Sequence, residues 1–418
     1  MGLSSEAQCG WKSKQAKGQA SCEGLQSKVW SGLLGNICSS SQTRYNQIAD
    51  CCCCLEPVDN PPNGCQVFIP QWILRRGDIH RATPRFYNAW SASEPTLYVK
   101  RNGAETQLIV SLYVDDLLVT GGDKFMLADF KTKMKEMFEM SDLGLITYFL
   151  RMEVNQVEGG ILLKQKTFAL KVLAKFSMEN CKPMSTPMAI GMKLSSQEEH
   201  ESVCETDYRS LIGCLLYLTA TRPDILFAVS MLSRFMHCCN QQHYKAGKRV
   251  LRYIKGTLNH GICFKRVKEL KLIGYTDSDW AGSKDDMKST SGYAFTPGSA
   301  MICWSSRKQT MVAQSTAEAE YVAAANAVNQ AVWLRKILSD LNLQQNEATV
   351  IHCDNKTKHF DIKLYVIREM EQAREIELIH CSSENQIADI FTKSLGVSRF
   401  LSLKRELGVC CIEVEEEC

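Results

Sequence analysis

The sequence predicts an α+β protein of two or three domains, in which paired strands and a group of helices precede an α/β domain. Its 418 residues are enough for two or three domains, and the 45% of hydrophobic residues provide a substantial core. Residues 208–256 have the apolar spacing of helices, interrupted at Arg222-Pro223-Asp224. Short apolar runs at residues 270–276 and 348–353 are typical of strands.

These two strands each deliver a carboxylate at their carboxyl end. The run 270–276 (LKLIGYT) ends at Asp277, and the run 348–353 (ATVIHC) ends at Asp354. Open α/β sheets place their functional sites at the carboxyl ends of strands. The turn signal Pro297-Gly298 predicts two further paired strands in the same domain.

A helix is expected to follow, and it carries two glutamates with different roles. Ser315 and Glu318 have the spacing of a capping box, in which Glu318 reaches back to the amide of Ser315. Glu320 lies two residues further on and points to another face. The apolar stripe of this helix, at helical spacing, consists of Tyr321, Ala325, Val328 and Val332.

A fourth acid completes a set that fits phosphoryl chemistry. Asp389 follows the apolar run 376–381 and is expected in the first turn of a last helix. In-line attack at phosphorus uses two Mg²⁺ ions, which three or four convergent carboxylates can hold. A solvated or capping role is the simpler explanation for any one of these acids. All four in this order, Asp277, Glu320, Asp354 and Asp389, favour a metal-dependent phosphodiester hydrolase.

Five segments around these acids resemble the ribonuclease H domain of copia-type retrotransposon polyproteins. They are GYTDSDWAGSKDDMKSTSGYAF, STAEAEYVAAANAVNQAVWL, CDN, KTKHFDI and NQIADIFTKSL. The resemblance implies a three-layer α/β domain that cuts the RNA strand of RNA:DNA hybrids with Mg²⁺ or Mn²⁺. It places the acidic site on Asp277, Glu320, Asp354 and Asp389. Only RNA offers 2′-hydroxyls in the minor groove, which lets such a domain distinguish the strands.

A second acidic pair lies upstream, at Asp115 and Asp116, where an apolar run is interrupted. We expect the pair at a hairpin tip between two buried strands, although a simple turn would more often carry Asn or Gly. The segment YVDD resembles the catalytic hairpin of reverse transcriptases, and residues downstream resemble the copia-type polymerase through its thumb and connection. The two resemblances cover residues 84–395.

The chain departs from this family pattern at positions that decide activity. No acid before Asp115 supplies the third metal ligand of a two-metal polymerase, and fingers and half the palm are missing, so we expect no DNA synthesis. A helix that the family has after the position of Asn355 is missing from this sequence, which affects the orientation of the Asp354 carboxylate. Arg151 stands where the family has Gly in a tight turn, a conformation that Gly tolerates better.

The formal net charge is only +3, so contact with nucleic acid must come from local patches. The clearest patch is one face of a predicted helix that carries five basic residues. They are Lys245, Lys248, Arg249, Arg252 and Lys255. A solvated amphipathic face explains the pattern equally well in isolation, while its place between the two resemblances favours contact with phosphates. The expected partners are an RNA:DNA hybrid or other nucleic acid and other retrotransposon proteins.

The 20 cysteines are expected to be reduced thiols of an intracellular, non-secreted protein, because the chain is long and their spacing is irregular. Metal binding by Cys51–Cys54, or by His237, Cys238, Cys239 and His243, is the less favoured alternative. No apolar run reaches eighteen residues, so no membrane span is expected.

The expected domain organisation has five parts. Residues 1–81 are an unrelated, disordered N-terminal segment, 82–188 an incomplete reverse transcriptase palm, and 189–266 a linker with a helical thumb and connection. Residues 267–396 are the ribonuclease H-like domain, and 397–418 a C-terminal tail. Two alternatives to hydrolysis stay open: a module that binds nucleic acid without cutting, and a decayed transposon remnant that does not fold stably.

Overall fold

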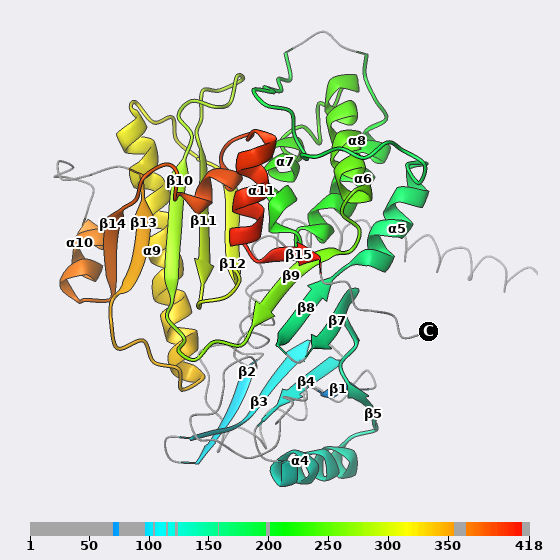
Figure 1. The fold of residues 1–418 in the computed structure, drawn as a ribbon, viewed down its shortest axis with the longest axis vertical. Helices are drawn as coiled ribbons and strands as arrows, with labels where there is room; N and C mark the ends of the chain where they lie inside the picture. The colour runs from blue at the N-terminus through cyan, green and yellow to red at the C-terminus, as the bar shows by residue number, and fades with distance from the viewer. Residues whose placement is uncertain are drawn as a thin grey trace, which may run out of the picture. The chain divides into compact units, whose positions relative to one another are not determined.

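The computed structural model describes most of the chain from residue 97 onward and one earlier strand (Figure 1). The described residues are 70–74, 97–102, 105–113, 116–121, 124–157, 159–197, 201–354 and 365–411. All of them belong to one compact unit, Gln42–Cys418. The Cys51–Cys54 run, Asp115 and the departure after Asn355 lie outside the described residues. No described helix has the length and apolar character needed to cross a bilayer.

The first sheet contains the predicted hairpin. Its strand order is β2-β3-β4-β1-β5. The strands are β1 (Pro70–Leu74), β2 (Leu97–Asn102), β3 (Glu105–Tyr113), β4 (Asp116–Thr120) and β5 (Met140–Leu145). β3 and β4 pair antiparallel with Tyr113 opposite Asp116, as the hairpin prediction requires. β1, which lies in a segment expected to be disordered, pairs with both β4 and β5.

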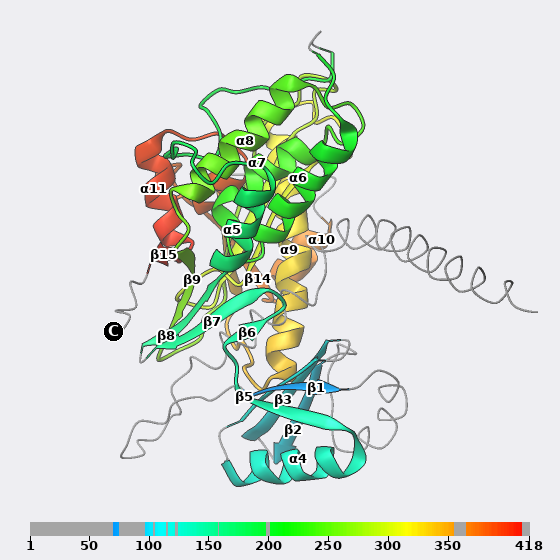
Figure 2. The same cartoon turned by 90° about the vertical axis from the view of Figure 1, so that its right-hand side faces the viewer.

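One helix covers this sheet, α4 (Lys124–Met137). Its Phe130 and Met134 pack against Leu108, Val110 and Val119 of β3 and β4. Figure 2 shows α4 beside the sheet. β4 is buried on both faces, because Leu117 and Val119 pack toward α4 while Leu118 belongs to another core cluster.

The second sheet has the order β15-β9-β8-β7-β6. The strands are β6 (Tyr148–Phe149), β7 (Met152–Val157), β8 (Gly160–Lys164), β9 (His260–Lys265) and β15 (Val409–Cys411). The turn between β6 and β7 holds Arg151 at a φ of 60°, the left-handed conformation for which a glycine was expected. The guanidinium of Arg151 lies over the rings of Phe168 and Tyr217, so the arginine gains packing at this strained position.

The structure has helices across residues 208–256, as predicted, and they are interrupted near Arg222-Pro223-Asp224 as expected. The helices are α5 (Lys166–Lys175), α6 (Glu205–Leu218), η1 (Pro223–Ile225), α7 (Leu226–Ser233) and α8 (Gln241–Lys255). Asn240 caps α8 by accepting from the amide of His243, whose Nδ1 in turn accepts from the amide of Asn240. His243 also stacks on Phe235, so its position is explained by capping and packing rather than by a metal.

The four predicted acids lie on the third sheet or next to it. The strand order of this sheet is β12-β11-β10-β13-β14. The strands are β10 (Ile273–Ser278), β11 (Thr290–Thr296), β12 (Cys303–Lys308), β13 (Thr349–Cys353) and β14 (Ile376–His380). The helices are α9 (Thr316–Asp340), α10 (Tyr365–Gln372), η2 (Ile387–Phe391) and α11 (Val397–Glu406). β10, β13 and β14 run parallel, whereas β10, β11 and β12 pair antiparallel.

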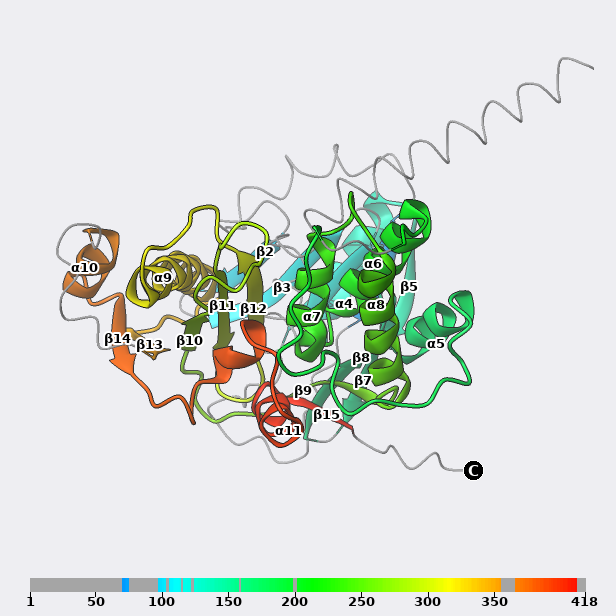
Figure 3. The same ribbon diagram turned by 90° about the horizontal axis from the view of Figure 1, so that it is seen from above.

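Helix α9 and the segment that leads into α11 lie on opposite sides of this sheet (Figure 3). The buried row of α9 begins with four alanines, Ala319, Ala323, Ala327 and Ala331, and continues with leucines. Of the apolar stripe expected from the sequence, only Val328 is fully buried, while Tyr321 and Ala325 pack at the margin of the core. Small residues let the helix approach the sheet closely.

A buried ion pair fixes the helical region. The guanidinium of Arg222 bonds both oxygens of Asp224, at 2.9 and 2.8 Å, and the hydroxyl of Tyr253 donates to the same carboxylate at 2.5 Å. Burial acts to raise the pKa of Asp224, but attraction to Arg222 prevails and lowers it to about 2. The pair therefore remains ionised inside the protein.

We predict that Asp224→Asn lowers the free energy of unfolding at neutral pH by about 3–5 kcal/mol, because Arg222 would stay buried without its counter-charge. The pKa of Asp224 lies below its ordinary value of 3.8 in the folded protein. The stabilisation is therefore present above about pH 4 and is lost as the pH falls towards 2. Urea unfolding at several pH values should show that the difference in unfolding free energy between wild type and Asp224→Asn becomes smaller as the pH falls from about 4 towards 2.

Asp129→Asn, in an exposed pair with Lys133, is the control and should lower the free energy of unfolding by less than about 1 kcal/mol. An equal loss in both variants would contradict the prediction.

Candidate functional site

Two parallel strands bring the first pair of acids to the same edge of the third sheet. β10 pairs with β13 so that Thr276 lies opposite Cys353, and the next residues are Asp277 and Asp354. The carboxyl ends of parallel strands meet at one edge, as the sequence analysis expected. Asp277 is completely buried, and Asp354 is partly exposed.

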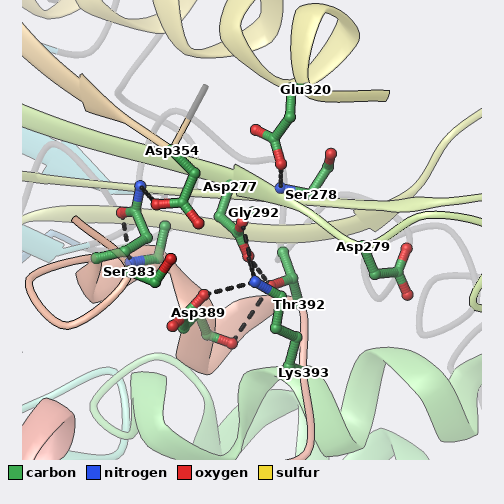
Figure 4. Close-up of polar contacts among 12 residues, drawn as sticks. Asp277, Ser278, Asp279, Gly292, Glu320, Asp354, Ser383, Asp389, Thr392 and Lys393 are labelled. Atoms are coloured by element: carbon green, nitrogen blue, oxygen red, sulfur yellow. Dashed lines mark hydrogen bonds and ion pairs between the residues drawn. The ribbon is translucent and has the colours of Figure 1, made fainter. Parts of the chain in front are cut away.

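Three of the four predicted acids converge at this edge (Figure 4). Asp277, Asp354 and Asp389 each offer a carboxylate oxygen, and these atoms all lie within 4.8 Å of one another. Asp389 lies in the first turn of a helix as expected, but this is the short 3₁₀ helix η2, and α11 follows it. No other group of this kind occurs among the residues that the structure describes.

Glu320, the fourth acid, lies beside this group without belonging to it. Its Oε1 accepts from the amide of Ser278, the residue that follows Asp277, at 3.2 Å. Its Oε2 is buried without a hydrogen-bond partner. A buried carboxylate oxygen without a partner is costly, so this atom is available to a ligand at the site.

The neighbouring Glu318 has the structural role expected, with one change. The hydroxyl of Ser315 accepts from the amide of Glu318 at 3.2 Å and caps α9. The carboxylate of Glu318 accepts from the amide of Gln314 at 2.8 Å, not from that of Ser315. Glu318 thus secures the start of the helix, and Glu320 in the next turn reaches the site.

Sequence reasoning missed a lysine at the centre of the site. The ammonium of Lys393 lies 2.7 Å from Oδ1 of Asp389 and 3.2 Å from Oδ2 of Asp277 (Figure 4). The preceding Thr392 donates its hydroxyl to Asp277. Lys393 follows Asp389 by four residues, a spacing common in ion pairs, which is the signal that could have identified it.

Burial and mutual repulsion govern the charges of these acids. Burial raises the pKa of Asp277 well above its ordinary range, and attraction to Lys393 opposes that rise. Burial raises the pKa of Glu320 to about 7, and repulsion from Asp354 adds to the rise. Burial likewise raises the pKa of Asp354. These carboxyls therefore carry less negative charge near neutral pH than isolated acids would, and their full ionisation would exceed the single charge of Lys393.

This donor set fits a small divalent cation. Every available ligand atom is a carboxylate oxygen, the type that Mg²⁺ and Mn²⁺ prefer. The three clustered aspartates share one edge of the sheet, and Glu320, with its unpartnered Oε2, lies beside them. A doubly charged ion would also relieve the repulsion that raises the carboxyl pKa values.

The upstream pair is only partly described. Asp116 begins β4 opposite Tyr113 and is partly buried, and Asp115 lies outside the described residues. Within the described part of the chain, Asp116 does not join any group of three metal-ligating side chains. A polymerase metal site at Asp115 and Asp116 stays a prediction.

The predicted basic face is present on α8, but its arginines are engaged. Arg249 donates to the hydroxyl of Thr186 at 3.0 Å, and Arg252 donates to the carbonyl of Lys182 at 2.7 Å. Lys245 is exposed, and Lys248 and Lys255 are partly exposed. The arginines therefore hold residues 182–186 against the helix, and nucleic-acid binding by this face stays a prediction.

Comparison with known proteins identifies the family of the chain. A family described as reverse transcriptase (RNA-dependent DNA polymerase) matches residues 85–190. The retrovirus-related Pol polyprotein from transposon RE1 of Arabidopsis thaliana is 38% identical over 333 residues, which are 76% of this chain and 23% of that protein. The corresponding polyprotein from transposon TNT 1-94 of Nicotiana tabacum is 36% identical over 340 residues, 76% of this chain and 26% of that protein.

A shorter relative is matched over nearly its whole length. The uncharacterized mitochondrial protein AtMg00810 of Arabidopsis thaliana is 37% identical over 222 residues, 53% of this chain and 92% of that protein. The chain thus belongs to a reverse-transcriptase-related class of proteins. More closely, it belongs to the Pol polyproteins of copia-type retrotransposons, as the sequence analysis concluded. It spans about a quarter of the length of the transposon polyproteins that it matches.

We predict that Lys393→Met makes the stability of the protein depend more strongly on Mg²⁺. Without its lysine, the site loses the charge that balances Asp277 and Asp389, so stability in chelator falls while the gain on adding Mg²⁺ grows. Thermal denaturation across a Mg²⁺ titration measures both effects. Lys336→Met, an exposed lysine of α9, is the control and should behave as wild type. An identical Mg²⁺ response in wild type and Lys393→Met would refute the prediction.

Proposed function

We propose that residues 267–396 form a ribonuclease H-like domain that hydrolyses the RNA strand of RNA:DNA hybrids with Mg²⁺ or Mn²⁺. The observation that carries the proposal is the convergence of Asp277, Asp354 and Asp389 at one sheet edge, with Glu320 beside them. Spacing in the sequence alone does not require these acids to meet. Their convergence makes a shared cation the simplest explanation of four acids in one partly buried place.

The arrangement of the third sheet supports the same proposal. Three antiparallel strands are followed by two parallel ones, with α9 on one face and η2 on the other, which is compatible with the three-layer domain that the resemblance implies. The sequence segments that resemble ribonuclease H surround these acids. Fold and motifs thus agree on one site.

We assign different roles to the residues of the site. Asp277, Asp354 and Asp389 would hold the cation, and Glu320 would complete its surroundings. When bound, the cation would supply Lewis-acid polarisation of the scissile phosphate. Thr392 orients Asp277 through its hydroxyl, and Gln386 orients Asp354 by donating to Oδ1 at 3.3 Å.

Gln386 joins two of the strands at the site. Its side-chain amide also donates to the carbonyl of Thr276, at 2.9 Å, and its Oε1 accepts from the amide of Ala388. It thus ties β10 and Asp354 to the segment that carries Asp389. Metal-site geometry depends on such supporting groups as well as on the ligands themselves.

Nucleic-acid binding is part of the proposal, and the basic face of α8 is its proposed location outside the nuclease domain. Lys245, Lys248 and Lys255 would contact phosphates, with Arg249 and Arg252 contributing charge while holding residues 182–186. Such contacts release counterions, so the affinity for hybrid should fall steeply as salt rises.

We predict that purified protein cuts the RNA strand of an RNA:DNA hybrid only with Mg²⁺ or Mn²⁺, and that Asp277→Asn lowers the rate more than about 100-fold. Even groups outside a metal's coordination shell change affinity or activity about 10- to 100-fold, so a ligand should matter at least as much. A labelled hybrid assay measures the rate. Glu377→Gln, an exposed acid on β14, should cut as wild type does. Hybrid binding without cutting by wild type would replace this proposal with the binding-module alternative.

We also propose that DNA polymerase activity is absent, because no acid before Asp115 supplies the third metal ligand. We predict no primer extension on a primed RNA or DNA template with Mg²⁺ or Mn²⁺. The assay compares the purified chain with an active reverse transcriptase under the same conditions. Extension that is lost in Asp116→Asn would refute this part of the proposal.

A further inference from the structure

Asp389 is the site carboxylate with the least regular support from its own backbone. It lies in η2, a 3₁₀ helix of five residues, whereas Asp277 and Asp354 stand at the ends of paired strands. Short 3₁₀ segments have poorer hydrogen-bond geometry than α-helices or sheets. The position of Asp389 must therefore depend on side chains that reach it from elsewhere.

One such side chain is Arg399 of α11, which lies in the segment expected to be a tail. Its Nη2 donates to the carbonyls of Ser383 at 2.7 Å and Gln386 at 3.1 Å, and its Nη1 donates to the carbonyl of Glu384. The same Nη2 lies 3.4 Å from Oδ2 of Asp389. The guanidinium of Arg399 thus binds three carbonyls of the turn before η2 and also contacts the carboxylate of Asp389.

Two cations hold the two oxygens of Asp389 from different parts of the chain. Lys393 contacts Oδ1, and Arg399 contacts Oδ2. The guanidinium is planar and presents its donors in a fixed fork, so it restricts orientation more than an ammonium does. Arg399 therefore limits how the Asp389 carboxylate can rotate.

Helix α11 is itself firmly anchored. Phe400 and Leu403 are buried, and the rings of Phe400 and Tyr253 meet edge to face at 5.5 Å. Lys404 is buried within 3.9 Å of Asp224, and β15 then pairs with β9. The helix that presents Arg399 is thus fixed at several points to the second sheet and the helical region.

We infer that Arg399 is a positioning residue for the metal site, so that the segment Val397–Cys411 belongs to the nuclease machinery. The inference rests on the proposed function and deepens it. By binding the turn at 383–386, Arg399 would fix the orientation of the Asp389 carboxylate toward the cation. It would not contact the hybrid or the cation itself.

The test compares Arg399→Met, Arg399→Lys and the control Arg405→Met, an exposed arginine of the same helix. Two readouts are measured across a Mg²⁺ titration: hybrid cleavage and the shift in melting temperature. Arg399→Met should raise the Mg²⁺ concentration for half-maximal cleavage about 10- to 100-fold and shrink the Mg²⁺-induced shift in melting temperature. The KM for hybrid should not change. Arg399→Lys should lie between wild type and Arg399→Met, because lysine keeps the charge but not the fork.

Each outcome decides the inference. Unchanged Mg²⁺ dependence in Arg399→Met, by both readouts, would overturn it, and so would an equal effect in Arg405→Met. If Arg399→Met does not fold, Arg399→Lys decides by the same two readouts. If wild type does not cleave, the proposed function fails separately, and the melting-temperature response still shows whether Arg399 supports cation binding.

Discussion

The structure around the third sheet depends on placing several carboxylates around a fully buried aspartate. Burying an ionised carboxylate costs several kcal/mol unless it is paired and hydrogen-bonded, and neighbouring acids add repulsion. Asp277 is held by Thr392 and Lys393, while Glu320 and Asp389 act against its charge. The elements that carry these acids must therefore be held together by interactions that do not come from the acids themselves.

Those interactions are concentrated around the end of β10. This strand is central, paired with β11 on one side and β13 on the other. Gly292 of β11 allows η2 to approach, because an added Cβ would lie 2.7 Å from the Cβ of Phe391. Ser306 of β12 donates to the carbonyl of Phe391 at 2.6 Å and fixes the same helix. Backbone packing thus offsets the repulsion among the side chains.

Local features of the site could be predicted from the sequence, and long-range ones could not. The strands that end at Asp277 and Asp354 are evident because apolar runs and their ends are local signals. The Arg399 contact was missed because it joins α11 to residues thirteen to sixteen positions earlier, which no helical or strand period connects. The strands β1 and β15 were missed for a similar reason. They have five and three residues, and distant partners rather than their own pattern determine that they pair.

Under the proposed function, the converged carboxylates would also link cation binding to folding. A divalent cation that binds the converged carboxylates binds the folded chain far better than an unfolded one, in which the acids are spread over more than a hundred residues. Lys393 supplies one positive charge to the same oxygens and so reduces both the repulsion and the affinity for a cation. Arg399 differs, because it contacts Oδ2 of Asp389 rather than the oxygen that Lys393 holds, and we propose that it orients the carboxylate. The two cations thus have opposite consequences for a metal: one competes for its ligands, and the other orients them.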